Sequence, residues 1–78
     1  MPLPIAQSRV LRFVADTGPA TTRQVTRGLQ LERDTARNAL TLLAGKGLVA
    51  EDRFTVPVSY KITDAGHLIL TAAEGGES

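Results

Sequence analysis

Residues 21–49 read TTRQVTRGLQLERDTARNALTLLAGKGLV, and this stretch decides the fold. Thr21 followed three residues later by Gln24 forms a capping box, in which the hydroxyl and the amide each satisfy a backbone N–H at a helix start. Val25 and Leu29 lie four residues apart and share one face of the helix that follows. The stretch therefore begins with a short capped helix that has one apolar side.

A second helix follows a short turn and is predicted for residues 33–46. Its small and apolar side chains recur at helical spacing and form one stripe: Ala36, Ala39, Leu40 and Leu43. Its opposite face carries side chains that form hydrogen bonds: Asp34, Arg37, Asn38 and Thr41. Gly47 suits a helix end, and Lys46 is well placed for the negative end of the helix dipole. Two short helices joined by a turn, the second with two distinct faces, indicate a helix-turn-helix.

The segments on either side of these helices complete the fold. Residues 5–17 carry apolar side chains near helical spacing, and Gly18-Pro19 ends that predicted helix. Residues 54–62 alternate apolar and polar side chains, which indicates a β-strand. Residues 48–50 are predicted to form a shorter strand before it, with a loop around residues 52–57 between the two.

A last short helix is predicted to begin at Thr63 or Asp64, since either side chain can cap a helix. Its predicted buried face is apolar: Ala65, Leu68, Ile69 and Ala72. The predicted fold class is therefore α+β and mainly α, a winged helix-turn-helix with a three-helix bundle, a two-stranded β wing and a short C-terminal helix. One domain is expected over residues 1–73, followed by a flexible polar tail at residues 74–78.

The apolar faces of these segments supply the predicted core: Val10, Phe13, Val14, Val25, Leu29, Leu31, Ala36, Leu40, Leu43, Leu48 and Ile62. Tyr60 is expected to be half-buried in the sheet. Leu42 lies off the main stripe of its helix, and a candidate dimer patch joins it to Leu3-Pro4-Ile5, Ile69 and Leu70.

Composition excludes several kinds of site. The chain has no cysteine and one histidine, so disulfides, thiolate metal sites, cysteine nucleophiles and multi-histidine metal sites are excluded. No catalytic Ser/His/Asp order or glycine-rich phosphate loop appears, so we predict neither an enzyme nor a cofactor, and His67 is expected at the surface. No apolar run approaches the roughly 18 residues of a membrane span, and the start does not resemble a signal peptide. A cytoplasmic location without membrane contact is expected.

The net charge of +1 conceals an uneven distribution. Through residue 49 the chain has seven basic side chains against three carboxylates, and from residue 50 it has two against five. Basic charge therefore gathers where the two-helix stretch lies, as a nucleic-acid surface requires. An ordinary solvated surface is the alternative explanation of the same pattern.

The exposed face of the second helix has the chemistry needed to read base pairs. The major groove admits one α-helix, in which arginine can engage guanine with two hydrogen bonds and asparagine can do the same with adenine. We therefore predict that Arg37, Asn38 and Thr41 read bases, and that Asp34 accepts from a cytosine amine or orients an arginine. The predicted contacts with the DNA backbone are Thr22, Arg23, Arg27, Arg33, Thr35 and Arg53.

The order of these motifs resembles the winged helix-turn-helix of MarR-, PadR- and ArsR-type bacterial regulators. The resemblance rests on Thr21-Thr22-Arg23-Gln24-Val25, on Thr35-Ala36-Arg37-Asn38-Ala39-Leu40, and on Lys46-Gly47-Leu48-Val49 followed by Ile62-Thr63-Asp64-Ala65-Gly66. It covers residues 10–70 and implies a DNA-binding transcription factor, usually dimeric. On that basis we expect a homodimer that binds double-stranded DNA and represses transcription by occupying a promoter.

Three departures from the family pattern bear on what the resemblance implies. Glu32 stands where serine often opens the recognition helix, and it is a poorer cap. The wing holds Glu51 and Asp52 beside a single Arg53, so phosphate would repel it and its contact with DNA is expected to be weak. The chain has no counterpart of the longer terminal helices of full regulators, so no small-molecule effector is expected. The acidic second half also keeps a second function open, that of a winged-helix module that binds protein and does not read DNA.

Overall fold

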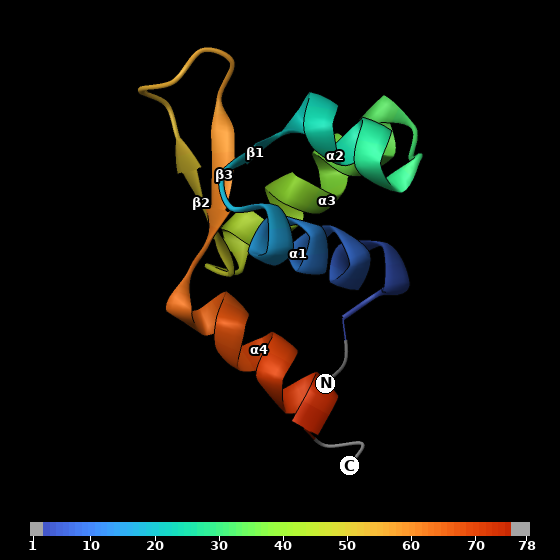
Figure 1. The fold of residues 1–78 in the computed structure, drawn as a ribbon, viewed down its shortest axis with the longest axis vertical. Coiled ribbons are helices and arrows are strands. Elements are labelled where there is room, and N and C mark those ends of the chain that lie inside the picture. Colours follow the sequence, from blue (N-terminus) through green and yellow to red (C-terminus); the bar gives the residue numbers. More distant parts are fainter. Residues whose placement is uncertain (1–2, 76–78) are drawn as a thin grey trace.

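The computed structural model describes residues 3–75, which form four helices around a small sheet (Figure 1). In chain order the elements are α1 (Ile5–Thr17), β1 (Ala20–Thr21), α2 (Thr22–Leu29), α3 (Arg33–Gly45), β2 (Val49–Asp52), β3 (Ser59–Ile62) and α4 (Asp64–Gly75). The sheet is antiparallel, with strand order β1-β3-β2. Helices α1, α2 and α3 pack against one another as the predicted bundle, and the α+β, mainly helical class is confirmed.

The two central helices begin where the sequence predicts, and α3 ends at Gly45, one residue before its predicted end. The Gln24 N–H donates to Thr21 Oγ1 at 3.2 Å and the Thr21 N–H donates to Gln24 Oε1 at 2.8 Å, so the capping box is present. Helix α2 ends at Leu29, and the C-cap residue Gln30 has a left-handed φ of 55° that turns the chain toward α3. The Glu32 side chain makes no capping hydrogen bond at the start of α3, which confirms that it is a poor cap.

Strand β1 adds a third strand to the two predicted from the sequence. Ala20 pairs with Tyr60 and Thr21 pairs with Ser59, both on β3. Because β1 has only two residues, of which the second is already the first residue of the capping box, it is too short to show the alternation that identifies a strand.

Strand β3 begins at Ser59, so the predicted loop around residues 52–57 is confirmed and the alternating residues 54–58 do not belong to the strand. The ladder with β2 ends at the pair of Asp52 and Ser59, and no strand is found at residues 53–58 of the described chain. Phe54 and Val56 are 99% and 97% exposed. Alternation predicted a strand here because the pattern cannot show how far the neighbouring strand extends.

The prediction of which face of α4 is buried is also wrong. Leu68 is 70% exposed, and Ala65, Ile69 and Ala72 are exposed as well. Gly66 is buried instead, and Leu70, four residues further on, packs on the core from the same side. The helix extends to Gly75, past its predicted end, and residues 76–78 of the predicted tail lie outside the described residues.

Contacts at the start of α4 explain why Gly66 and Leu70 face the core in place of the predicted residues. A Cβ on Gly66 would lie 2.3 Å from the Leu48 carbonyl oxygen, so only glycine permits the observed approach of helix to strand. Thr63 Oγ1 donates to the Gly47 carbonyl oxygen at 2.7 Å and accepts from the Gly66 N–H at 3.2 Å. The Thr63 N–H donates to the Leu48 carbonyl oxygen at 3.1 Å, which closes the junction.

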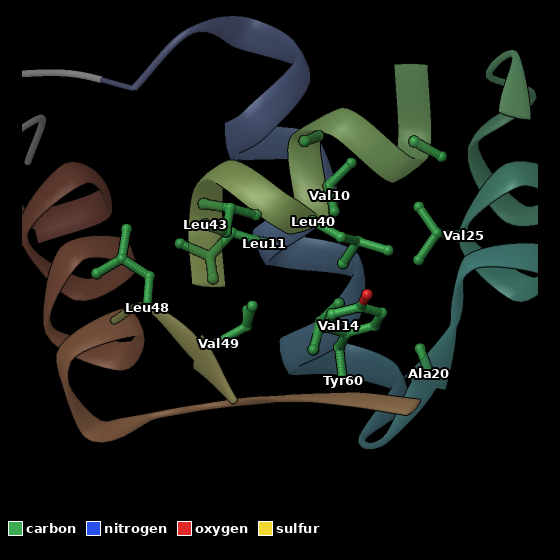
Figure 2. Packing of buried hydrophobic residues seen from close by; sticks show 12 residues of the cluster. Val10, Leu11, Val14, Ala20, Val25, Leu40, Leu43, Leu48, Val49 and Tyr60 are labelled. Atoms are coloured by element: carbon green, nitrogen blue, oxygen red, sulfur yellow. The ribbon is translucent and has the colours of Figure 1, made fainter. Parts of the chain in front are cut away.

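The core lies between the helices and the sheet (Figure 2). Among the predicted core residues, those buried are Val10, Val14, Val25, Ala36, Leu40, Leu43 and Leu48, and those partly buried are Phe13, Leu29, Leu31 and Ile62. Hydrophobic side chains buried beyond that prediction are Leu11, Ala20, Ala39, Val49 and Tyr60. Ile5, by contrast, is 80% exposed, so the buried face of α1 begins further along the helix. This core holds α2 and α3 in place against the sheet.

Candidate nucleic-acid interface

A groove of about 820 Å³ opens between α2 and α3 on one side and the β2–β3 hairpin on the other. Four arginines line it: Arg23, Arg27, Arg33 and Arg37. The other lining residues are Thr21, Thr22, Thr26, Glu51, Pro57, Val58 and Tyr60. Guanidinium groups gathered in a concave surface focus the electric field and attract anions, so this groove is a cationic one with a single carboxylate in its wall.

The structure brings five of the predicted DNA-contacting residues together in this groove: Thr22, Arg23, Arg27, Arg33 and Arg37. Arg23 and Arg27 lie four residues apart on α2, and Arg33 and Arg37 lie four apart on α3, so each pair projects from one helix face. The capping box fixes where α2 begins, and therefore which of its faces carries the arginines. Two helices thus supply the cationic side of the groove.

The remaining predicted residues of α3 do not line the groove. Asp34, Asn38 and Thr41 are exposed, and with 3.6 residues per turn they lie in the middle of the outer face, next to the line of arginines. Thr35 is exposed on the opposite flank of the helix. Helix α3 therefore presents a polar outer face with the groove along one of its edges.

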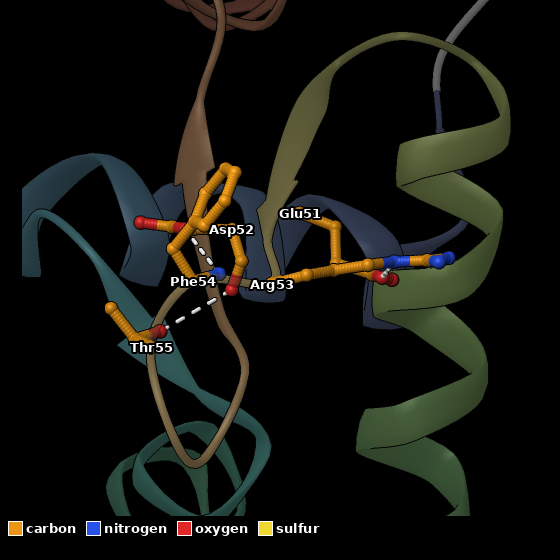
Figure 3. Close-up of polar contacts among 5 residues, drawn as sticks. All are labelled: Glu51, Asp52, Arg53, Phe54 and Thr55. Atoms are coloured by element: carbon orange, nitrogen blue, oxygen red, sulfur yellow. Dashed lines mark hydrogen bonds and ion pairs between the residues drawn. The ribbon is translucent and has the colours of Figure 1, made fainter.

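Arg53, also predicted to contact the DNA backbone, does not line the groove and is bound to Glu51 (Figure 3). Its Nε donates to Glu51 Oε1 at 2.5 Å and the two groups form an ion pair. The hydrogen bond and the negative charge of Glu51 raise the pKa of Arg53 above its ordinary value. A guanidinium that is paired with a carboxylate has less attraction for phosphate, so this arginine is a weaker candidate than those of the groove.

Glu51 and Tyr60 line the groove, although the sequence did not single them out as site residues. Burial raises the pKa of Tyr60 most; the charge of Glu51 and its hydrogen bond raise it further, while Arg37 and Arg53 oppose the shift. The phenol is therefore neutral over the physiological range. The two residues face each other directly across β2 and β3, so the strand register was the signal that could have placed both.

The part of the chain that the structure describes has neither a metal cluster nor a membrane-spanning helix. Residues 3–75 hold no group of three His, Cys, Asp or Glu side chains that could bind a metal ion. No helix of that same range is both long enough and apolar enough to cross a membrane. His67 is exposed on α4 and does not line the groove.

The fold and the cationic groove together define a winged helix-turn-helix domain. A family model described as the MarR family matches residues 1–53. Because this match covers more than half of the chain, the protein belongs to the MarR family, whose members are transcription regulators and not enzymes. Comparison with curated protein sequences finds no significant match.

Solved structures of MarR-type proteins share the fold. A MarR family protein from Bacillus stearothermophilus is 20% identical to this chain and superposes with a TM-score of 0.87; the match covers 97% of this chain and 54% of the B. stearothermophilus protein. BpsR from Bordetella bronchiseptica is 25% identical to this chain and superposes with a TM-score of 0.81; the match covers 96% of this chain and 56% of BpsR. MarR from Staphylococcus aureus is 22% identical to this chain and superposes with a TM-score of 0.80; the match covers 87% of this chain and 47% of the S. aureus protein. The chain thus spans about half the length of the solved proteins it matches.

Proposed function

We propose that this domain binds double-stranded DNA with α3 in the major groove, and that it represses transcription as a homodimer. The observation that carries the proposal is the groove beside α3, where four arginines gather around a single carboxylate. Duplex DNA carries a negative charge about every 1.7 Å along its axis, and arginines that neutralise phosphates release the condensed counterions. A cytoplasmic location, as predicted from the sequence, accords with this function.

The proposed contacts divide according to position on the surface. On the outer face of α3, Arg37, Asn38 and Thr41 read base edges, and Asp34 accepts from a cytosine amine or orients a neighbouring arginine. The sugar–phosphate backbone is held by Thr22, Arg23, Arg27, Arg33 and Thr35, with Arg53 contributing least because Glu51 holds it.

A homodimer would double the contacts that one small domain can make. Helices α1 and α4 pack against each other, and exposed apolar side chains lie on both of them and on α3: Ile5, Leu68, Ile69 and Leu42. Of the dimer patch predicted from the sequence, Leu3 and Leu70 pack against the core instead. The exposed residues are the surface we propose for dimerisation. A two-fold dimer binds two half-sites about one helical turn apart, which predicts a palindromic operator.

Two of the similar solved proteins are described together with small molecules that bind or regulate them. The S. aureus protein was solved with salicylate and kanamycin, and DNA binding by BpsR is regulated by 6-hydroxynicotinic acid. We propose that the domain described here, residues 3–75, binds DNA without such an effector. Salicylate added to the DNA complex is expected to leave the affinity unchanged, and release of the DNA would show that the domain itself has an effector site.

A winged-helix module that binds protein is the second candidate function. It is favoured by the acidic second half of the chain, which has two basic side chains and five carboxylates from residue 50 onward. Binding through an apolar patch changes little with salt, whereas DNA affinity falls steeply as salt rises.

One experiment separates these functions. The protein is incubated with a pool of random duplexes at two salt concentrations, and the bound duplexes are sequenced. We expect enrichment of a palindromic motif that weakens at the higher salt concentration. An absence of enrichment at low salt would rule out the DNA-binding function and favour the protein-binding module.

A further inference from the structure

The loop at the tip of the wing, residues 53–58, has an unusual division between polar and apolar side chains. Its polar groups turn inward and hold the backbone: the Phe54 N–H donates to Asp52 Oδ1 at 2.9 Å (Figure 3), and Thr55 Oγ1 lies 3.1 Å from both the Pro57 carbonyl oxygen and Ser59 Oγ. Its apolar side chains point outward, because Phe54 and Val56 are almost completely exposed. The tip is therefore a defined loop that presents two apolar side chains to its surroundings.

The tip belongs to the same surface as the cationic groove. Pro57 and Val58, from the same loop, line the groove together with the arginines of α2 and α3. The wing loop and α2 lie at the same end of the molecule, opposite α4 (Figure 1). A ligand in the groove therefore lies next to the loop that carries Phe54 and Val56, although these two side chains do not themselves line the groove.

One of the two carboxylates of the wing is less of an obstacle to DNA than the sequence suggests. Glu51 forms an ion pair with Arg53, which partly compensates its negative charge. Asp52 keeps its charge and accepts a hydrogen bond from the Phe54 N–H, which fixes the loop backbone. Because of these charges the wing was expected to contribute little to DNA binding. The exposed Phe54 and Val56 offer a contact that does not depend on charge.

We propose that Phe54 and Val56 form an apolar wedge that enters the minor groove of the bound duplex and partly unstacks a base step. This inference rests on the proposed DNA-binding function and adds a second contact to it. Apolar side chains inserted in this way kink the duplex, and the cost of unstacking depends on the sequence of the step. The wing would then select flexible pyrimidine–purine steps next to the site that α3 reads.

The size of the tip favours DNA over a protein partner. A buried phenylalanine covers about 150–250 Å², and a stable protein interface buries about 800 Å² on each partner. Two side chains on a narrow loop fall far short of such an interface. A wedge between bases needs no more than one or two apolar side chains.

The test uses the duplex obtained by the selection described above, with 2-aminopurine placed in turn at each step on either side of the α3 site. The fluorescence of this base analogue rises when it is unstacked. We expect the wild-type protein to raise it at one step in each half-site and to shorten the end-to-end distance of the duplex measured by energy transfer. The double variant F54A/V56A is expected to lose both signals and to bind roughly tenfold more weakly, while it keeps the motif read by α3.

The control variant is F54L, which keeps an apolar side chain at the tip and is expected to retain most of the fluorescence change. Both positions are so exposed that none of these variants should change stability, which thermal unfolding checks. Equal affinity and equal fluorescence for wild type and F54A/V56A would overturn the wedge and leave the DNA-binding function standing. Loss of self-association by the double variant, with DNA affinity unchanged, would overturn it in favour of an interface between copies. If the selection yields no duplex, both proposals fail together.

Discussion

Replacing Gly66 with alanine tests the contact that seats α4 on the sheet. The new Cβ would lie 2.3 Å from the Leu48 carbonyl oxygen and 2.6 Å from Ile62 Cγ1. The first of these is a backbone atom, which cannot move aside by changing a rotamer. We therefore expect α4 to shift away from β2 and to strain the junction that Thr63 closes.

The size of the effect follows from the contacts at stake. Inserting a methyl group into a close-packed contact costs about 1–3 kcal/mol. The shift also weakens two hydrogen bonds of Thr63, one to the Leu48 carbonyl oxygen at 3.1 Å and one to the Gly47 carbonyl oxygen at 2.7 Å, each worth about 1 kcal/mol. A loss of roughly 2–4 kcal/mol is expected, and for a domain of this size it lowers the unfolding temperature by roughly 10–30 °C.

Gly45→Ala is the matched control. A Cβ on Gly45 would meet no atom within 4 Å, and the residue lies at the end of α3. The same substitution is therefore expected to raise stability there, by up to about 1 kcal/mol, because alanine favours the helix. Circular dichroism melts of the two variants and the wild type give all three midpoints. A G66A midpoint equal to that of the wild type would refute the reasoning, as it would show that α4 does not rest on the Leu48 carbonyl group.

The remaining predictions concern the groove. Arg37→Ala should cost roughly 1–3 kcal/mol of binding and relax the preference at one base pair, measured by repeating the selection, and an unchanged motif would remove Arg37 from base reading. Arg23→Ala should weaken binding to all duplexes about equally and lower the slope of log K against log salt by about one, whereas a sequence-selective effect would contradict a backbone role. Glu51→Gln should tighten binding roughly two- to tenfold at low salt, because it removes the one carboxylate among the described residues of the groove and releases Arg53 from its ion pair; Asp16→Asn removes a carboxylate that is paired with Arg12 on α1 outside the groove, and an equal gain there would show an effect of net charge alone. The pKa of Tyr60 is raised in the folded protein, so its neutral form stabilises the fold below the unfolded pKa of about 10, and that contribution is lost as pH rises through the folded value; ultraviolet titration of this single tyrosine checks it, and a midpoint at or below that of a free tyrosine would contradict it.

The sequence predicts those parts of the fold in which local chemistry decides the structure. The capping box at Thr21 and Gln24 forms because both partners lie within one helical turn. The apolar stripe of α3 is buried throughout because its spacing matches the helix. In both cases the interacting residues are near neighbours in the chain, so the pattern carries the necessary information.

The parts that the sequence did not predict depend on contacts between distant segments. Which face of α4 is buried is decided by Gly66 and the backbone of Leu48, and hydrophobicity alone pointed to the wrong face. The length of β3 is decided by where β2 ends. The same limit applies to the groove, because five predicted residues meet there, whereas Glu51 and Tyr60 enter it only through the register of two strands.

Strand β1 gives the groove a mechanical property. Its two residues pair with Ser59 and Tyr60 on β3 and continue without a break into α2. The helical wall and the hairpin wall are therefore joined at their base by backbone hydrogen bonds, and neither can swing without the other. A segment of DNA backbone bound in the groove, as proposed, would meet two walls that are already joined, so the entropy lost on binding would come mainly from ordering the arginine side chains and little from ordering the protein backbone.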